Sequence, residues 1–309
     1  MRNRGNCDKI GSMSDKMKRA LANAALLTVG AIWGGSFVVM KSAIASMPVN
    51  FILLLRFGVA ALALSFFFLR NRERVNKRLF AAGGILGTLQ YGVFALQNYG
   101  LMQTTAGKNA LVQASYIVLV PFVLWVVRKT RPKVRMVAAA LICVCGIGLL
   151  CLGGGDRGVN MGDVLTLISA VIYSVYIVAV DGFLEKHDMM QLTCVQFATA
   201  AVWAGAVFLM TEKAPAAYTP NMISELAYCC LLGTLAALTL QNVGIKYGAP
   251  ETSALLLSTE APFAVLFGTV FLKETMNGRM IIGCVLIIAA IAISQLNIKK
   301  KEELSTENG

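Results

Sequence analysis

Long apolar segments separated by short polar ones make up most of the chain. Each segment is close to the roughly 20 residues that a helix needs to cross the hydrocarbon core of a bilayer. The segments are continuous and do not alternate with a period of two, so they predict helices and not barrel strands. The ten predicted membrane spans are residues 20–40, 50–69, 79–101, 107–127, 135–152, 161–180, 190–210, 222–245, 249–272 and 280–298.

The composition places the chain in the same class. Of its 309 residues 57% are hydrophobic and only 14% are charged, and the mean hydropathy is +0.68. A soluble domain of this length has too little interior to bury so much apolar surface. The short connections between spans leave no room for a soluble domain. We therefore predict an all-α integral membrane protein.

The basic residues lie mostly on one side of the predicted membrane. They gather in residues 1–19, 70–78, 128–135 and 299–301, which all fall inside if the N-terminus is cytoplasmic. With this topology 21 of the 28 lysines and arginines lie inside and six lie near the outer side, which is the positive-inside pattern. This placement explains the net charge of +12 without nucleic acid as a partner. We predict a multi-pass protein of the plasma (inner) membrane with cytoplasmic tails at 1–19 and 299–309.

The second half of the chain repeats the first. LQN at 96–98 recurs as LQN at 240–242, and at this offset of 144 twelve of 57 successive positions are identical. Nearer the N-terminus the offset becomes 140, where LRF at 55–57 aligns with VQF at 195–197. An odd number of spans in each copy places the second copy upside down, and inverted repeats are characteristic of secondary transporters. The two predicted five-helix repeats are residues 20–152 and 161–298.

Three stretches resemble a known family. They are AIWGGSFV at 31–38, LRF at 55–57 and TSALLLSTEAPFAVLFGTVFLKE at 252–274. These stretches are similar to an EamA-type transporter of the drug/metabolite transporter superfamily, and the resemblance extends over about residues 20–298. The resemblance implies a carrier of ten helices in two repeats, a fold that commonly exports amino acids or other small metabolites.

Some residues have a packing interpretation beside a functional one. Pro121 and Pro262 each remove a backbone hydrogen bond within a span, which predicts a kink suited to gating. Their settings differ, YIVLVPF against TEAPF, so the two helices are not strictly equivalent. The polar pairs of the two LQN stretches either line a cavity or bond neighbouring helices, and their place near span ends favours packing. These pairs are Gln97 with Asn98 and Gln241 with Asn242.

Polar side chains on one face of a predicted span indicate an inward surface, because lipid disfavours them. In the fourth span Asn109, Gln113 and Tyr116 share a face at i, i+4 and i+7. Two amides and a phenol in this arrangement either orient a zwitterion or an amine, or bond between helices. Gln90 belongs to an inward face of the third span together with Gln97. The aromatic candidates, which either pack or line the cavity, are Trp33, Tyr173 and Tyr176.

Two ionisable residues lie inside predicted spans. A charge at such a depth costs roughly 2.5–3.5 kcal/mol on insertion scales, and it commonly marks a transport pathway or a buried pair. Glu260 is a candidate proton carrier and substrate contact, or else a carboxyl group paired for structure. Arg56 either binds a carboxylate through two hydrogen bonds or extends toward the interface and supports packing. For Arg56 the second interpretation is preferred.

Other classes of function lack their motifs. The single histidine, His187, lies in a predicted loop, so neither a metalloprotease motif nor a serine–histidine pair can form within the spans. No Walker-type phosphate loop is present, and the eight cysteines have no paired spacing, so we expect no enzyme activity, metal or cofactor. We predict a monomeric or homodimeric secondary transporter in the lipid bilayer. It would move a small organic solute by alternating access, with proton coupling or exchange and with amino-acid export as the favoured case. The alternative is a channel-like or scaffold membrane protein without active transport.

Overall fold

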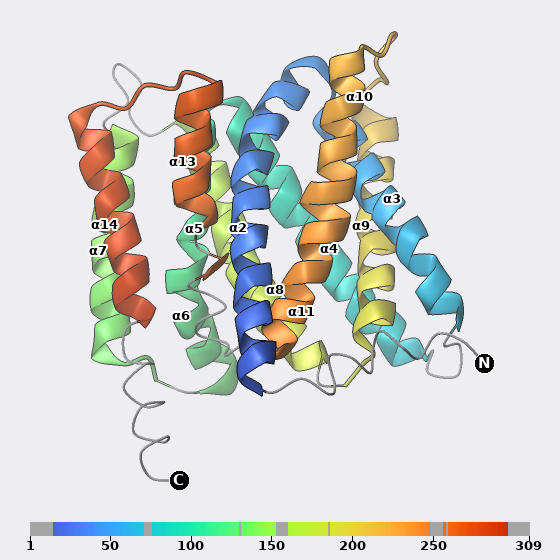
Figure 1. Cartoon of the computed structure of the whole chain (residues 1–309), viewed down its shortest axis with the longest axis horizontal. Helices are drawn as coiled ribbons and strands as arrows, with labels where there is room; N and C mark the ends of the chain where they lie inside the picture. Colours follow the sequence, from blue (N-terminus) through green and yellow to red (C-terminus); the bar gives the residue numbers. More distant parts are fainter. Residues whose placement is uncertain are drawn as a thin grey trace.

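The fold is a bundle of helices that stand side by side (Figure 1). The computed structural model describes residues 15–70, 76–129, 131–152, 160–184, 186–247, 256–257 and 259–295. Within these ranges every regular element is helical, as the apolar pattern predicts. The elements are α2 (Asp15–Ser46), α3 (Val49–Arg70), α4 (Lys77–Met102), α5 (Ala106–Ala114), α6 (Tyr116–Arg128), α7 (Val134–Leu152), α8 (Met161–Leu184), α9 (Met189–Thr211), α10 (Pro220–Ala227), η2 (Tyr228–Ala236), α11 (Ala237–Tyr247), α13 (Glu260–Phe271) and α14 (Gly278–Gln295).

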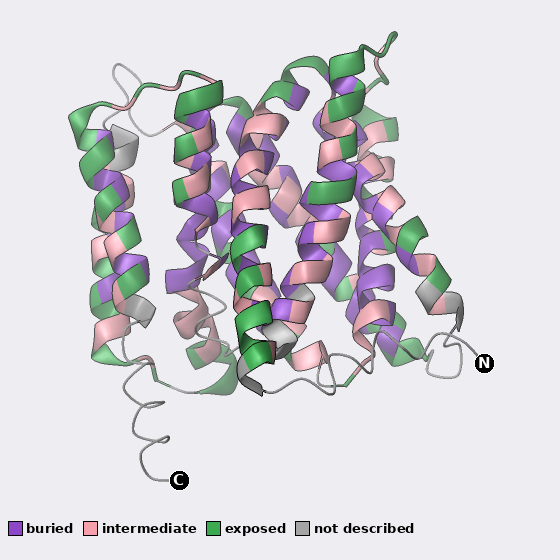
Figure 2. Cartoon of the chain, viewed as in Figure 1, coloured by how far each residue is buried: buried purple, intermediate pink, exposed green. Residues whose placement is uncertain are grey.

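Many of these helices are suited to a bilayer. In the described part of the chain seven are long and apolar enough to cross a membrane. Three shorter apolar helices accompany them, over Val134–Leu149, Glu260–Phe271 and Gly278–Ile293. The exposed residues lie on the outer side of the bundle (Figure 2), and they include large apolar side chains such as Leu209 and Met210. The prediction of a helical membrane protein is confirmed, whereas the count of ten spans stays a prediction.

Helices from the two halves of the chain pack against one another. α3 lies along α9, and α7 lies along α14, at opposite ends of the bundle (Figure 1). Between these pairs α2 packs on α11 and α13, while α4 packs on α8 and α9. The buried side chains therefore lie between the halves, and neither half forms a separate core.

Glycines allow α2 to approach α13 closely. A Cβ atom on Gly34 would lie 2.4 Å from the Cβ of Phe263 and 3.0 Å from the carbonyl oxygen of Glu260. A Cβ atom on Gly30, one turn earlier, would lie 3.2 Å from the carbonyl oxygen of Leu256. Gly30 and Gly34 thus leave space on α2 for the start of α13.

Partly buried acidic side chains hold together the edge of the bundle that is uppermost in Figure 1. Glu274, which follows α13, accepts hydrogen bonds from the backbone N–H groups of Ala106 (2.6 Å) and Gly107 (3.1 Å) at the start of α5. Glu212, at the end of α9, accepts a hydrogen bond of 3.0 Å from the backbone N–H of Asn50 at the start of α3. The free N–H groups and the dipole at a helix N-terminus favour a negative charge there. Each carboxylate therefore ties one half of the chain to the other.

A buried ion pair joins α5 to α8 at the same edge. Lys108 Nζ lies 2.7 Å from Asp163 Oδ2, and the two side chains are 6% and 3% exposed. The ion pair between Arg128 and Asp181, near the opposite edge, has side chains that are 45% and 60% exposed. The ion pairs at the two edges therefore differ strongly in their contact with solvent.

The fourth predicted span is interrupted before its proline. Ser115 separates α5 from α6, and its hydroxyl donates a 2.7 Å hydrogen bond to the carbonyl of Val112. Pro121 lies further along, inside α6. Pro262 lies in the first turn of α13, where a backbone N–H has no partner within the helix, so its absence opens no gap in α13. Ser258, whose carbonyl a kink at Pro262 would leave free, lies outside the described residues, so the predicted kink in this span stays a prediction.

Candidate functional site

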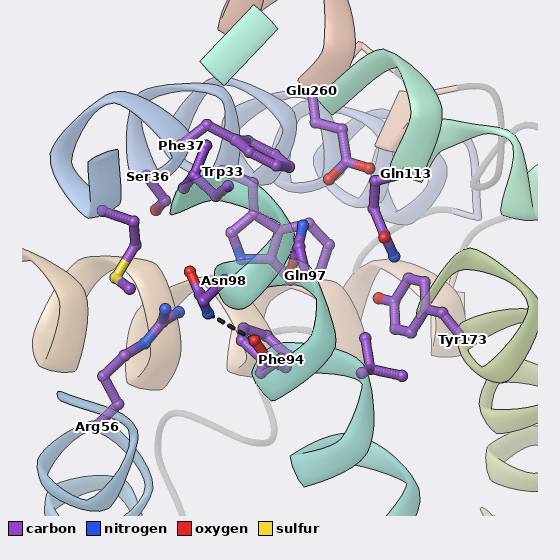
Figure 3. A pocket seen from close by; sticks show the side chains of 13 residues that line it. Trp33, Ser36, Phe37, Arg56, Phe94, Gln97, Asn98, Gln113, Tyr173 and Glu260 are labelled. Carbon is purple, nitrogen blue, oxygen red and sulfur yellow. Dashed lines mark hydrogen bonds between the residues drawn. The ribbon is translucent and has the colours of Figure 1, made fainter. Parts of the chain in front are cut away.

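A cavity lies among α2, α3, α4, α5, α8 and α13 (Figure 3). The space open to the centres of water molecules is about 60 Å³, which is room for several waters. Its wall is largely apolar with a few polar groups, as in most small-molecule sites. Seven residues singled out from the sequence line it: Trp33, Arg56, Gln97, Asn98, Gln113, Tyr173 and Glu260.

Glu260 occupies one end of the cavity (Figure 3). It is the first residue of α13 and is only 4% exposed, so the helix dipole favours its carboxylate while the surroundings are dry. The oxygen Oε1 of Gln113 and the hydroxyl of Tyr116 are buried and have no hydrogen-bond partner among the described residues. Tyr116 packs edge-to-face on Tyr173, with ring centroids 4.6 Å apart. Gln113 therefore brings an unsatisfied oxygen to this end of the cavity, whereas Tyr116 packs on the lining residue Tyr173 and does not line the cavity itself.

Arg56 lies at the other end of the cavity (Figure 3). Its Nε donates a 2.9 Å hydrogen bond to the hydroxyl of Thr234, and its Nη2 lies 3.5 Å from the carbonyl oxygen of Gly233. The guanidinium carbon is 4.9 Å from the ring centroid of Phe94, in the range of a cation–π contact. The expectation that Arg56 extends toward the interface is wrong, because acceptors inside the bundle hold a side chain that is 3% exposed.

The acceptors of Arg56 belong to the π-helical segment η2. The carbonyl of Gly233 also accepts a 3.1 Å hydrogen bond from the indole N–H of Trp33. The hydroxyl of Thr234 donates to the carbonyl of Cys229, five residues earlier, at 2.8 Å. Short π-helical segments often mark functional sites, because they change where backbone carbonyls point. Sequence periodicity did not reveal this segment, since it carries no signal for such a register.

A second polar cluster lies apart from the cavity. Gln196 donates hydrogen bonds to Oε1 of Gln90 and, at 2.7 Å, to the hydroxyl of Tyr176. Gln90 and Tyr176 were predicted to bind substrate, but neither lines the main cavity. Gln196 itself was missed, although the repeat contains a signal for it: VQF aligns with LRF, so Gln196 is the counterpart of Arg56.

Asn109 joins three helices. Its Nδ2 donates hydrogen bonds to the hydroxyl of Thr166 at 2.7 Å and to the carbonyl of Gln97 at 3.2 Å. These bonds link α5 to α8 and α4, and Asn109 is fully buried. Its contacts are those of a packing residue, which was one of the two interpretations from the sequence.

The two LQN stretches are both partly buried. Asn98 lines the cavity, and its Nδ2 donates a 2.7 Å hydrogen bond to the carbonyl of Phe94 in its own helix. Gln241 is buried and forms a side-chain hydrogen bond with Tyr173, so it lies behind the cavity wall. The side chain of Asn242 lies outside the described residues. The first stretch thus contacts the cavity directly, and the second supports it.

Comparison with known proteins identifies the family. The chain matches the model of the EamA-like transporter family over residues 20–152 and 160–295. The chain belongs to this family. The EamA resemblance of its sequence is therefore confirmed, and the chain is a membrane transporter of the drug/metabolite transporter superfamily.

Relatives of this EamA-family chain are similar over nearly their whole length. An uncharacterized transporter of Archaeoglobus fulgidus is 29% identical, with 92% of this chain and 89% of the relative aligned. A probable terminal-alkyne amino-acid exporter of Streptantibioticus cattleyicolor is 23% identical, with 94% of this chain and 99% of the relative aligned. One solved structure, named only as a crystal structure of a protein, has a TM-score of 0.67 at 19% identity. It covers 92% of this chain and 99% of its own, and it supports the fold alone.

Proposed function

We propose that this EamA-family transporter is a ten-span carrier that exports an amino acid or a related small metabolite by alternating access. The observation that carries the proposal is a cavity with polar ends that is lined by helices of both halves. A carrier needs such a site between its two repeats. Since one chain lines the cavity, a monomer is sufficient, and a homodimer would hold two such cavities.

Equivalent contacts support an inverted repeat. By the offset of 140 Arg56 corresponds to Gln196, and by the offset of 144 Gln90 corresponds to Thr234. Arg56 donates to Thr234, and Gln196 donates to Gln90. The same contact is therefore made twice with the roles of the halves exchanged, as expected for two copies related by an internal two-fold axis. We place these copies at residues 20–152 and 161–298.

The distribution of basic residues supports the orientation. α2 begins and α14 ends toward the lower edge of Figure 1, which also holds the starts of α4 and α7. Lysines and arginines concentrate at that edge, and they include Lys77, Arg128, Lys133 and Lys186. The positive-inside rule then favours a cytoplasmic lower edge, with both tails inside the cell.

The name of one relative supports the substrate class. The Streptantibioticus protein is a probable exporter of a terminal-alkyne amino acid. We apply to this chain only the broader class, an amino acid or a related metabolite. Binding of such a solute requires polar groups at fixed positions in an apolar wall, which Glu260, Gln113 and Arg56 provide.

Flux into proteoliposomes tests this function. We expect saturable uptake of at least one amino acid that stops when its gradient is removed. Gln113→Ala should lower the rate about tenfold, because it removes a hydrogen-bonding group of the cavity. The matched control is Gln103→Ala, which changes an exposed glutamine beyond the end of α4. Uptake that rises linearly with solute concentration would contradict a carrier and favour a channel.

Proton coupling through Glu260 is a separate expectation. A buried carboxyl group that faces the cavity can take up and release a proton as the two sides open in turn. The titratable groups near it are the phenols of Tyr116 and Tyr173. We expect a pH gradient to change the wild-type rate and to leave the rate of Glu260→Gln unchanged. The same dependence on the gradient in both proteins would rule out this role, and Glu225→Gln is the control.

A further inference from the structure

Two buried ionisable side chains, one basic and one acidic, face one cavity without pairing. Arg56 is 3% exposed and Glu260 is 4% exposed, and they lie at opposite ends of the cavity (Figure 3). Among the described residues neither forms an ion pair. A buried charge without a counter-charge is costly, so the cavity is electrostatically incomplete at both ends.

The end at Glu260 is rich in acceptors. The Oε1 atom of Gln113 has no partner among the described residues, although the side chain is 3% exposed and lines the cavity. The hydroxyl of Tyr116 is also unpartnered in the described chain, but Tyr116 does not line the cavity. A primary ammonium group carries three N–H donors and no acceptor. It is therefore the cation that matches a carboxylate beside an amide oxygen.

At the other end of the cavity, Arg56 has N–H donors that form no hydrogen bond with the described residues. A guanidinium group has five N–H donors, and the described contacts of Arg56 use one from Nε and one from Nη2. Its plane is held by Thr234 on one side and by Phe94 across its face. The remaining donors suit the two oxygens of a carboxylate, which arginine binds through parallel hydrogen bonds.

The repeat shows that this fold accepts neutral residues at both positions. By the offset of 140 the counterpart of Arg56 is Gln196, and by the offset of 144 the counterpart of Glu260 is Tyr116. Gln196 and Tyr116 are buried at 5% and 2% exposure. Each of these two positions is therefore neutral in one copy and ionisable in the other, so packing at these depths does not require a charge. Contact with a ligand is a reason for both ionisable side chains, and it is compatible with the proton coupling proposed for Glu260.

The geometry points to a zwitterion as the substrate, with its ammonium group at Glu260 and Gln113 and its carboxylate at Arg56. The apolar middle of the molecule would lie against Trp33, which lines the cavity between the two ends (Figure 3). This inference rests on the proposed transport function and deepens it, because it assigns each end of the solute to a named side chain. It also excludes simple amines and simple carboxylates as good substrates.

Matched ligands test the inference on the wild-type protein. The probes are L-alanine, L-leucine and L-phenylalanine, each with its carboxamide, which lacks the carboxylate, and its N-acetyl derivative, which lacks the ammonium group. Binding is measured by thermal stabilisation of the purified protein and by competition for flux in proteoliposomes. At least one amino acid should bind about tenfold or more tightly than both of its derivatives, since a hydrogen bond to a charged group contributes about 1.5–3 kcal/mol.

Variants of Glu260 and Arg56 test which side chain binds which end of the solute. In the Glu260→Gln variant the N-acetyl derivative should bind as tightly as the parent amino acid. In the Arg56→Gln variant the carboxamide should bind as tightly as the parent amino acid. Arg56→Lys keeps the charge and should keep part of the preference for a carboxylate, which protects the test if Arg56→Gln fails to fold. The control Arg128→Gln removes an exposed arginine and should leave all preferences unchanged.

The outcomes separate the inference from the transport function. If a carboxamide or an N-acetyl derivative is transported as readily as its parent amino acid, the substrate need not be a zwitterion. The proposed carrier function would be unaffected by that result. An amino-acid preference that survives both Glu260→Gln and Arg56→Gln would overturn the assignment of the two ends. No binding of any of the three amino acids would overturn the inference, whereas no flux of any solute would overturn the proposed function itself.

Discussion

Charged side chains inside the bundle differ in whether the protein supplies their partner. Lys108 and Asp163 pair with each other at 2.7 Å, and Glu274 accepts two backbone hydrogen bonds at the start of α5. Among the described residues Arg56 donates to a hydroxyl and a carbonyl but to no acid, and Glu260 forms no ion pair. The first group serves stability. The second group is the one that the proposed zwitterionic substrate would complete.

At the scale of single residues, the two ion pairs should differ strongly in their effect on stability. Lys108→Met leaves Asp163 as an unpaired buried charge, so we expect a loss of about 3–5 kcal/mol in the free energy of unfolding. Arg128→Met breaks an exposed pair and should cost about 0–1 kcal/mol. Thermal and denaturant unfolding of both variants in detergent measures the difference. Equal losses would contradict the burial of the Lys108 pair.

At the scale of elements, the approach of α2 to α13 depends on the absence of side-chain atoms. Gly34→Ala would place a Cβ atom 2.4 Å from Phe263, so the two helices must separate. Overpacking of this kind typically costs about 1–3 kcal/mol, and the shift would also disturb the cavity wall between Trp33 and Glu260. We expect a lower melting temperature and weaker solute binding for this variant.

A second glycine is the control for this prediction. A Cβ atom on Gly84, in α4, would meet nothing within 4 Å. Gly84→Ala should therefore raise stability by up to about 1 kcal/mol, because alanine favours the helix more than glycine does. If both variants destabilise the protein equally, the close contact at Gly34 is not what positions α2.

At the scale of the whole molecule, the orientation can be measured with single cysteines. Lys213 follows α9 at the upper edge of Figure 1, and Lys186 precedes α9 at the lower edge; both are exposed. A membrane-impermeant maleimide applied to intact cells should label Lys213→Cys. It should label Lys186→Cys only after the membrane is opened. The parent chain, with its own cysteines, gives the background, and the reverse pattern would place the basic edge outside.

The sequence predicted where helices form better than it predicted which helices pack together. Apolar length predicted the helices, and helical spacing placed Gln113 on an inward face, because both signals are local. Helical spacing does not say which helix an inward face meets, so Gln90 was assigned to the cavity although it bonds to Gln196. The contact of Glu274 with the start of α5 joins positions 168 residues apart. The π-helical hydrogen bonding of η2 likewise produces no periodic pattern in the sequence.

The unequal edges of the bundle have a kinetic consequence for an alternating carrier. Opening the bundle at the upper edge would separate Lys108 from Asp163. It would also move the carboxylates of Glu274 and Glu212 away from the helix N-termini that they cap. The Arg128–Asp181 pair near the lower edge is already solvated, so separating these two side chains costs less than separating Lys108 from Asp163. In the proposed alternating-access cycle, the conformation that is closed at the upper edge would then be the more populated one. The turnover of the carrier would be set by the rare opening of that edge, and a tighter solute would not make it faster.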